Sequence, residues 1–342
     1  MNQAATEPLL ITMGCPVGIG PELILKFFTR PDNPHRRLPV VVVGDPAVLH
    51  MCSRALALSA AIVPWQPGDP VDPDVLPVYL PPDSSPLDPA ALTWGQPDRQ
   101  TGAAMAGWIE AAVALIRRGA ASGLVTCPIS KKALHEAGSP FPGHTEMLAA
   151  LCQSATFAMM MAGRTLKVTL VTIHQSLASV SSSLSIAGVA NLIDMTGRSL
   201  RDDFAIAVPR LAVAAMNPHA GENGLFGDEE ERIIAPAILQ ARQTGWLVSG
   251  PYPPDTVFHR AVTGAFDAVV CMYHDQGLIP FKLLHFADGV NVTIGLPIVR
   301  TSVDHGTAYD IAGQGIADPA SLYAAVAMAA EIATNRRRIP HD

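Results

Sequence analysis

Three histidines follow apolar runs whose composition is typical of buried β-strands. They are His174 after residues 166–173, His219 after residues 211–216 and His274 after residues 268–273. In a parallel sheet the carboxyl ends of strands open at one edge, so three imidazoles placed there could bind a single divalent metal ion. Each histidine alone also fits a hydrogen-bonded turn residue, because their long separations form no local metal motif. Their shared position favours an enzyme.

Polar residues are dense around and after the third histidine. Lys282 and Arg300 could bind an anionic substrate, since arginine suits bidentate contact and lysine supplies a point charge. Surface ion pairs are the alternative, but only 15% of the chain is charged, which favours a functional role. Asp255 and Asp275 could orient imidazoles as supporting carboxylates, or could cap turns.

Two turn segments could bind a ligand. The glycines Gly14, Gly18 and Gly20 lie between a strand-like run and a helix-like run, but their spacing is not the dinucleotide fingerprint. They fit a tight turn and a cofactor loop equally well. His144 and Thr145 precede the helical run 147–152, where a phosphate or carboxylate could bind a positive helix end. Spacing alone favours a threonine N-cap with an exposed histidine.

Composition excludes several classes of protein. The chain has 342 residues, 49% of them hydrophobic, and a net charge of −7. Only residues 336–338 form a basic run, which argues against a nucleic-acid partner. No apolar stretch reaches the roughly 18 residues that span a bilayer, and no secretory signal is evident. Five scattered cysteines fit a reducing compartment, so we expect a cytoplasmic protein with no membrane partner.

Strand, turn and helix patterns alternate along the chain, which predicts an α/β fold with a parallel sheet. Strands are expected at 9–13, 40–43 and 122–126, and helices at 22–28, 102–118 and 320–332. Ten prolines interrupt the segment 64–97, which predicts loops or an edge strand there. The length favours two domains.

Longer motifs connect the chain to a known family. They are GIGPE (18–22), TCPISKKAL (126–134), GHTE (143–146), NPHAGENGLFGDEE (217–230), YHDQGLIPFK (273–282) and GLPIVRTSVDHGTAYDIAG (295–313). With these motifs the chain resembles the 4-hydroxythreonine-4-phosphate dehydrogenase family, PdxA, from Leu9 to Ala330. The resemblance implies two α/β/α lobes with largely parallel sheets, of the isocitrate/isopropylmalate dehydrogenase-like type, with NAD in the cleft between them. We expect one lobe at 1–135 plus 305–342, and a second at 136–304 carrying most site residues and a dimer interface.

The resemblance also implies residue roles. A divalent metal (zinc, magnesium or cobalt) would bind the three histidines, with His274 supplied by the partner subunit of a homodimer. The implied substrate contacts are His144, Thr145, Lys282, Asn291 and Arg300. The implied reaction is oxidation of the secondary alcohol of 4-phosphohydroxy-L-threonine by NAD or NADP. The β-keto acid formed would lose carbon dioxide, leaving 3-amino-2-oxopropyl phosphate for pyridoxal phosphate synthesis.

One residue departs from the family pattern and keeps other substrates open. Cys15 stands where the family has Asp or Glu, and a neutral thiol cannot supply that negative charge. Related enzymes oxidise 4-phospho-D-threonate or 4-phospho-D-erythronate, and a more distant branch oxidises dihydrodiols. The intact GHTE motif favours a phosphorylated four-carbon substrate. A phosphate acyltransferase would not need the three histidines, and a catalytically silent binding protein would be expected to lack one of them.

Overall fold

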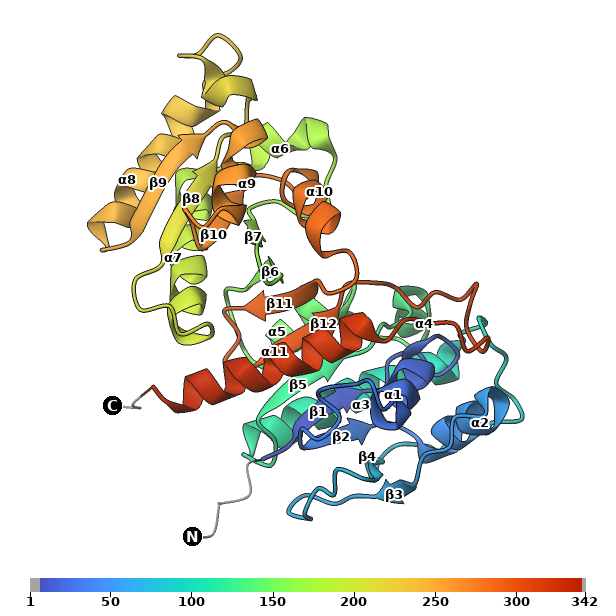
Figure 1. Ribbon diagram of the computed structural model, residues 1–342. Helices are drawn as coiled ribbons and strands as arrows, with labels where there is room; N and C mark the ends of the chain where they lie inside the picture. The colour runs from blue at the N-terminus through green and yellow to red at the C-terminus, as the bar shows by residue number, and fades with distance from the viewer. Residues whose placement is uncertain (1–6, 340–342) are drawn as a thin grey trace. The chain divides into compact units, whose positions relative to one another are not determined.

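The structure, a computed structural model, describes residues 7–339 and divides into two compact units. Unit 1 contains the described residues up to Ala155 together with Leu296–Ala333. Unit 2 contains Thr156–Gly295 and the described residues from Thr334 onward. In Figure 1 the strands of unit 1 run from blue to teal and end in red, whereas unit 2 runs from green to orange.

Unit 1 contains a fully parallel sheet in the order β3-β4-β2-β1-β5-β12. Its strands are β1 (Leu9–Thr12), β2 (Val40–Val43), β3 (Ile62–Pro64), β4 (Leu76–Tyr79), β5 (Gly123–Thr126) and β12 (Arg300–Val303). All residues of β2 are buried valines, as expected for a parallel strand that is covered on both faces.

Several helices of unit 1 begin with a side-chain cap. They are α1 (Gly20–Thr29), α2 (Pro46–Leu56), α3 (Arg99–Arg117), α4 (Lys131–Glu136), α5 (His144–Leu151) and α11 (Ala320–Arg337), which begins in this unit. Asp45 caps α2 before a proline, and Asp98 forms a capping box with Thr101 at α3. The connection β1–α1–β2 crosses the sheet in one direction and β4–α3–β5 in the other, so right-handed crossovers place α1 and α3 on opposite faces.

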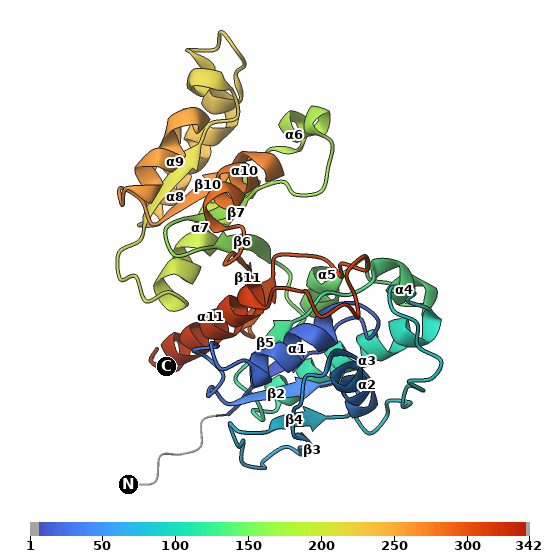
Figure 2. The ribbon, with the colours of Figure 1, turned by 45° about the vertical axis from the view of Figure 1, so that its right-hand side comes forward.

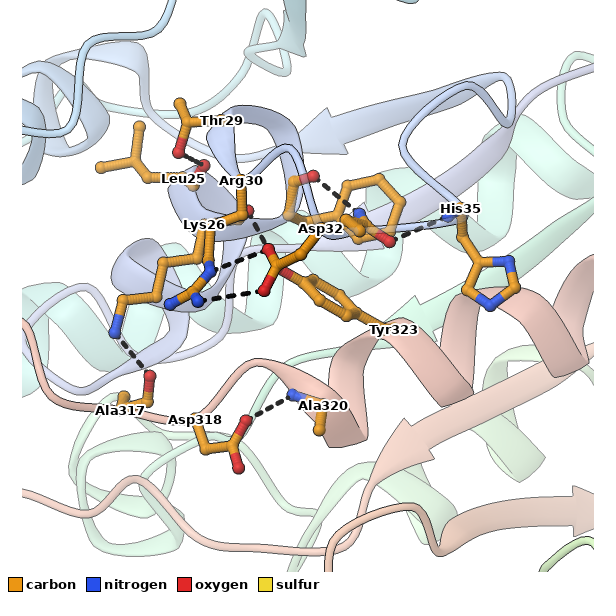
Figure 3. A network of polar contacts seen from close by, with 12 residues as sticks. Leu25, Lys26, Thr29, Arg30, Asp32, His35, Ala317, Asp318, Ala320 and Tyr323 are labelled. Carbon is orange, nitrogen blue, oxygen red and sulfur yellow. Dashed lines mark hydrogen bonds and ion pairs between the residues drawn. The ribbon is translucent and has the colours of Figure 1, made fainter.

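Helix α1 is tied to the segment that precedes α11 by a buried ion pair. Lys26 lies 2.7 Å from Glu22 and donates to the carbonyl oxygen of Ala317 at 2.5 Å. The backbone N–H of Ala317 donates to Glu22 at 2.8 Å. Figure 3 shows the Lys26–Ala317 contact beside Tyr323, whose hydroxyl donates to the Lys26 carbonyl. The glutamate of GIGPE therefore has a structural role in joining distant segments of unit 1.

Unit 2 contains a mixed sheet in the order β11-β6-β7-β10-β8-β9. Its strands are β6 (Ala158–Ala162), β7 (Lys167–Leu170), β8 (Arg210–Ala214), β9 (Leu247–Tyr252), β10 (Ala268–Cys271) and β11 (Val290–Ile294). Strand β6 is antiparallel to both β7 and β11, whereas β7, β10, β8 and β9 form a parallel group. This parallel group positions the histidines.

The helices of unit 2 cover this sheet, as Figures 1 and 2 show. They are α6 (Leu177–Ser183), α7 (Ile186–Asp202), α8 (Ala235–Gln243), α9 (Pro254–Val262) and α10 (His274–His285), with a 3-10 turn η1 (Pro218–Gly221) and a π-helical turn η2 (Glu230–Ile234). Phe281 on α10 packs in the core with Val168 and Val269 of the neighbouring strands. Helix α10 is thereby fixed against β7 and β10.

The predicted α/β class with largely parallel sheets is confirmed, but two details differ. The division between units falls after Ala155 and before Leu296, not after residues 135 and 304, because α5 packs against α3 and β12 pairs with β5. The proline-rich segment 64–97 contains β4, which is an interior strand between β3 and β2. Among residues 7–339 no single helix is long and apolar enough to cross a membrane; only α6 and α7 together, across a 93° bend, reach that length and composition.

Candidate active site

The three candidate metal ligands follow three adjacent parallel strands. Strand β10 lies between β7 and β8, and the histidines come three to five residues after these strands end, at His274, His174 and His219 respectively. The predicted strand runs are confirmed. In the sheet, the strand before His274 lies between the strands before His174 and His219, so the order of the strands differs from the order along the chain. The carboxyl edge of this parallel group therefore carries all three imidazoles.

His174 and His274 lie side by side within one chain. Their ring centroids are 6.0 Å apart, and both rings line a pocket of about 480 Å³ in unit 2. Asp275 accepts a hydrogen bond from Nδ1 of His274 at 2.7 Å, which leaves Nε2 to act as a ligand. This contact supports the orienting role considered for Asp275. The two imidazoles of this pocket are suitable ligands for a divalent cation but supply only part of a ligand set.

His219 lies on a separate turn with an unusual backbone. It is exposed in η1 and has a φ of 52°, in the left-handed region. Within residues 7–339, no group of three or more His, Cys, Asp or Glu side chains is close enough to hold a metal ion. Asp255 is exposed in the first turn of α9, a helix that contacts η1, and in the described part of the chain no hydrogen bond joins it to an imidazole.

In unit 1, helix α5 begins with a half-buried histidine. Gly143 is the N-cap, so His144 and Thr145 are the first helical residues and neither caps the helix. The expected threonine N-cap with an exposed histidine is therefore wrong, because the N-cap is Gly143, two residues before Thr145, and His144 is half-buried. Nε2 of His144 is buried without a hydrogen-bond partner among the described residues. A substrate oxygen could supply that partner.

Arg300 is a buried cation in the same unit. Its side chain reaches from the start of β12 to the end of β5, where Nη2 donates to the Thr126 hydroxyl at 2.8 Å. Burial lowers the pKa of Arg300 to about 10, and the charge of Glu146 opposes that effect. The guanidinium therefore stays charged at neutral pH and suits an anionic group.

The electrostatic environment of His144 predicts a pH effect on stability. Burial, with the charges of Arg300 and Lys131 nearby, holds the pKa of His144 well below its usual value. Below about pH 6.5 the unfolded chain binds a proton that the folded chain excludes, so the free energy of unfolding falls as pH falls. We expect this residue to account for about 1 kcal/mol of the loss between pH 7 and 5.5. Urea unfolding of the wild type and His144→Asn at both values checks this, and an identical pH dependence would contradict it.

The two remaining predicted substrate contacts lie in unit 2. Lys282 is half-buried on α10, and Asn291 lies on β11 opposite Met161. Oδ1 of Asn291 is buried without a hydrogen-bond partner among residues 7–339. A buried amide oxygen of this kind is a candidate acceptor for a ligand. The roles of both residues in substrate binding remain predictions.

Packing explains the glycines of the first loop. A Cβ at Gly14 would lie 2.4 Å from the carbonyl oxygen of Pro128, and one at Gly20 would lie 2.2 Å from that of Met13. At Gly18 a Cβ would be 3.1 Å from the Thr307 carbonyl oxygen. The whole loop is buried, which favours the tight-turn interpretation, and a cofactor role stays a prediction. Burial also raises the pKa of the Cys15 thiol, so this side chain is neutral near pH 7.

Sequence reasoning assigned no role to several residues that the structure places at these sites. Thr126 ends β5 and accepts a hydrogen bond from Arg300. Its position at a strand end was the one feature of the sequence that could have marked it as a site residue. Glu229 and Glu230 end the NPHAGENGLFGDEE motif and bond to the turn that carries His219. Thr126 and Arg300 are 174 positions apart, so spacing could not pair them, whereas both glutamates lie within 13 residues of Asn217 in one motif.

The chain is thus a two-unit α/β protein whose histidines and Arg300 lie at strand ends, an arrangement typical of enzymes. The model of the family described as pyridoxal phosphate biosynthetic protein PdxA matches residues 36–329. The 4-hydroxythreonine-4-phosphate dehydrogenase of Desulfosudis oleivorans is 54% identical over 329 residues, 94% of this chain and 95% of its own. The crystal structure of the Klebsiella pneumoniae enzyme of that name has a TM-score of 0.87 at 43% identity, covering 96% and 100% of the two chains.

A more distant solved structure belongs to a dihydrodiol dehydrogenase, one of the alternative activities. The terephthalate 1,2-cis-dihydrodiol dehydrogenase of Burkholderia xenovorans has a TM-score of 0.65 at 27% identity, covering 95% of this chain and 98% of its own. The chain belongs to the PdxA family, and it is an oxidoreductase that acts on a CH–OH group.

Proposed function

We propose that the chain catalyses the metal-dependent oxidation of 4-phosphohydroxy-L-threonine by NAD. The observation that carries the proposal is the position of His174, His274 and His219 after three adjacent parallel strands in a member of this family. The secondary alcohol would lose a hydride to the nicotinamide and a proton to water. The resulting 2-amino-3-oxo acid phosphate would then lose carbon dioxide to give 3-amino-2-oxopropyl phosphate.

The polar residues of both units have distinct roles in this proposal. Bound by the histidines, a divalent cation such as zinc, magnesium or cobalt would lower the pKa of the substrate hydroxyl. Arg300, aimed by Thr126, would bind an anionic group, and the neutral His144 would offer Nε2 to a substrate oxygen. Thr145, Lys282 and Asn291 are further proposed contacts. Asp275 would keep His274 in the tautomer that presents Nε2.

A comparison of two substrates tests this function. We expect the purified protein to reduce NAD with 4-phosphohydroxy-L-threonine at a kcat/KM at least about tenfold above that for 4-phospho-D-threonate. A chelator should abolish turnover, and added metal should restore it. NADH absorbance reports both results. Preference for 4-phospho-D-threonate would move the assignment to that substrate, and no turnover of either would refute it.

We further propose that two copies of the chain pair through helix α10. Ile279, Leu283 and Phe286 lie at i, i+4 and i+7 on one face and are 67%, 85% and 80% exposed. A contiguous exposed apolar stripe of this kind marks an interaction site. The same helix begins with His274, and the described residues of one chain bring no three ligands together. A second copy of the chain would therefore cover the stripe and complete the metal site.

Substituting one residue of the stripe tests the pairing. Leu283→Asp should convert a dimer to monomer, because it would bury an unpaired charge in each half of the interface. Light scattering after size exclusion measures the mass, and kcat should fall together with the dimer fraction. Leu239→Asp, at an exposed leucine on α8, is the control expected to remain a dimer. A wild-type protein that is monomeric at assay concentration would contradict the pairing.

A further inference from the structure

The turn that carries His219 has a backbone that must be held in place. Six consecutive residues, 219–224, have positive φ values, and four of them are not glycine. Such residues are uncommon in the left-handed region, which disfavours side chains with a Cβ. A turn of this kind persists only when its surroundings determine it. The contacts that hold the turn therefore also fix the direction of the His219 side chain.

Glu230 supplies those contacts from the first position of η2. Its buried carboxylate accepts the backbone N–H groups of Met216 and Asn217, both at 2.8 Å, and the Asn217 side-chain amide at 3.0 Å. A Cβ at Gly221 would lie 2.7 Å from Oε2 of Glu230, so a glycine there leaves room for the carboxylate. Glu230 thus bonds to the residues that lead into the turn, and its carboxylate fills the space beside Gly221.

Glu229 connects the same turn to α6. One carboxylate oxygen accepts from the Asn217 amide at 2.7 Å, and the other accepts from the hydroxyl of Ser181. Helix α6 is in turn bonded back to the segment of His174, because Gln175 donates to Ser183 at 3.0 Å. Together with the backbone of α6, these hydrogen bonds link the residue next to His174 to the turn that carries His219.

We infer that Glu229 and Glu230 are positioning residues for the metal ligands. Glu230 fixes the left-handed turn of His219, and Glu229 sets the position of that turn relative to the His174 segment through Ser181. This inference rests on the proposed metal site. Neither carboxylate needs to contact the ion, because their effect is to hold two ligand segments in register before the ion binds.

Cobalt binding by the full chain tests the inference. Calorimetry gives the affinity for Co²⁺, and its visible absorption reports the coordination geometry. Glu230→Ala should weaken binding by about 10- to 100-fold and alter the cobalt spectrum. Glu230→Gln keeps an acceptor for the two backbone N–H groups and should recover most of the affinity. Glu231→Ala, at an exposed glutamate on the same turn, should match the wild type within about twofold.

A milder pair of variants covers the case in which Glu230→Ala fails to fold. Ser181→Ala removes one hydrogen bond to Glu229 and should weaken cobalt binding by about fivefold. Ser182→Ala is its control, since among residues 7–339 that hydroxyl bonds only to the Ser179 carbonyl oxygen within α6. If Ser181→Ala and folded Glu230→Ala both bind cobalt with wild-type affinity while His219→Ala loses binding, the positioning role is overturned and the metal site stands. Wild-type affinity in His219→Ala would refute the metal site and the inference with it.

Discussion

Replacing His274 by alanine should reduce kcat/KM by at least about a thousandfold, because a bound metal ion stabilises the transition state by several kcal/mol. His274 lines the pocket that it shares with His174, and its ring is already oriented by Asp275. Steady-state NADH formation in saturating metal measures the loss. We expect it to appear mainly in kcat, since the ion acts on the reacting alcohol.

Two further variants show whether the loss comes from ligation. Asp275→Asn keeps the shape of the side chain but weakens its hold on His274, and should cost about 10- to 100-fold. His259→Ala removes an exposed histidine on α9 and should leave activity unchanged. A His274→Ala protein that keeps a tenth of wild-type activity at the wild-type metal affinity would contradict the assigned role.

Replacing Arg300 by leucine should reduce kcat/KM by about a hundred- to a thousandfold, because a buried charged hydrogen bond to an anionic substrate is lost. Arg300→Lys keeps a charge but not the planar fork, so a smaller loss, mainly in KM, is expected. Arg198→Leu removes an exposed arginine on α7 and is the matched control. An unchanged KM for the phosphorylated substrate in Arg300→Leu would exclude the anion-binding role.

Much of the fold could be predicted because its signals are local. The run Val40–Val43 is short, continuous, apolar and β-branched, which is typical of a strand buried on both faces, and it forms β2. The same reasoning located the strands before His174, His219 and His274. It also indicated that these residues share one edge of a sheet, because parallel strands have a common carboxyl edge.

The rest depended on contacts that sequence spacing does not encode. Thr126 and Arg300 are 174 positions apart, and only the pairing of β12 with β5 brings them together. The order β7-β10-β8 places His274 between the other two histidines, which chain order could not show. The cap of α5 was predicted two residues too late, at Thr145, because Gly143 caps the helix through its extended backbone without a side-chain hydrogen bond.

The most direct test of the account is the location of a bound metal ion in crystals of the full chain. Anomalous X-ray diffraction at the cobalt edge should place one ion per chain on the Nε2 atoms of His174, His219 and His274, with at least one of these rings supplied by a second copy. An ion bound elsewhere, or these three rings without an ion at saturating cobalt, would contradict the account.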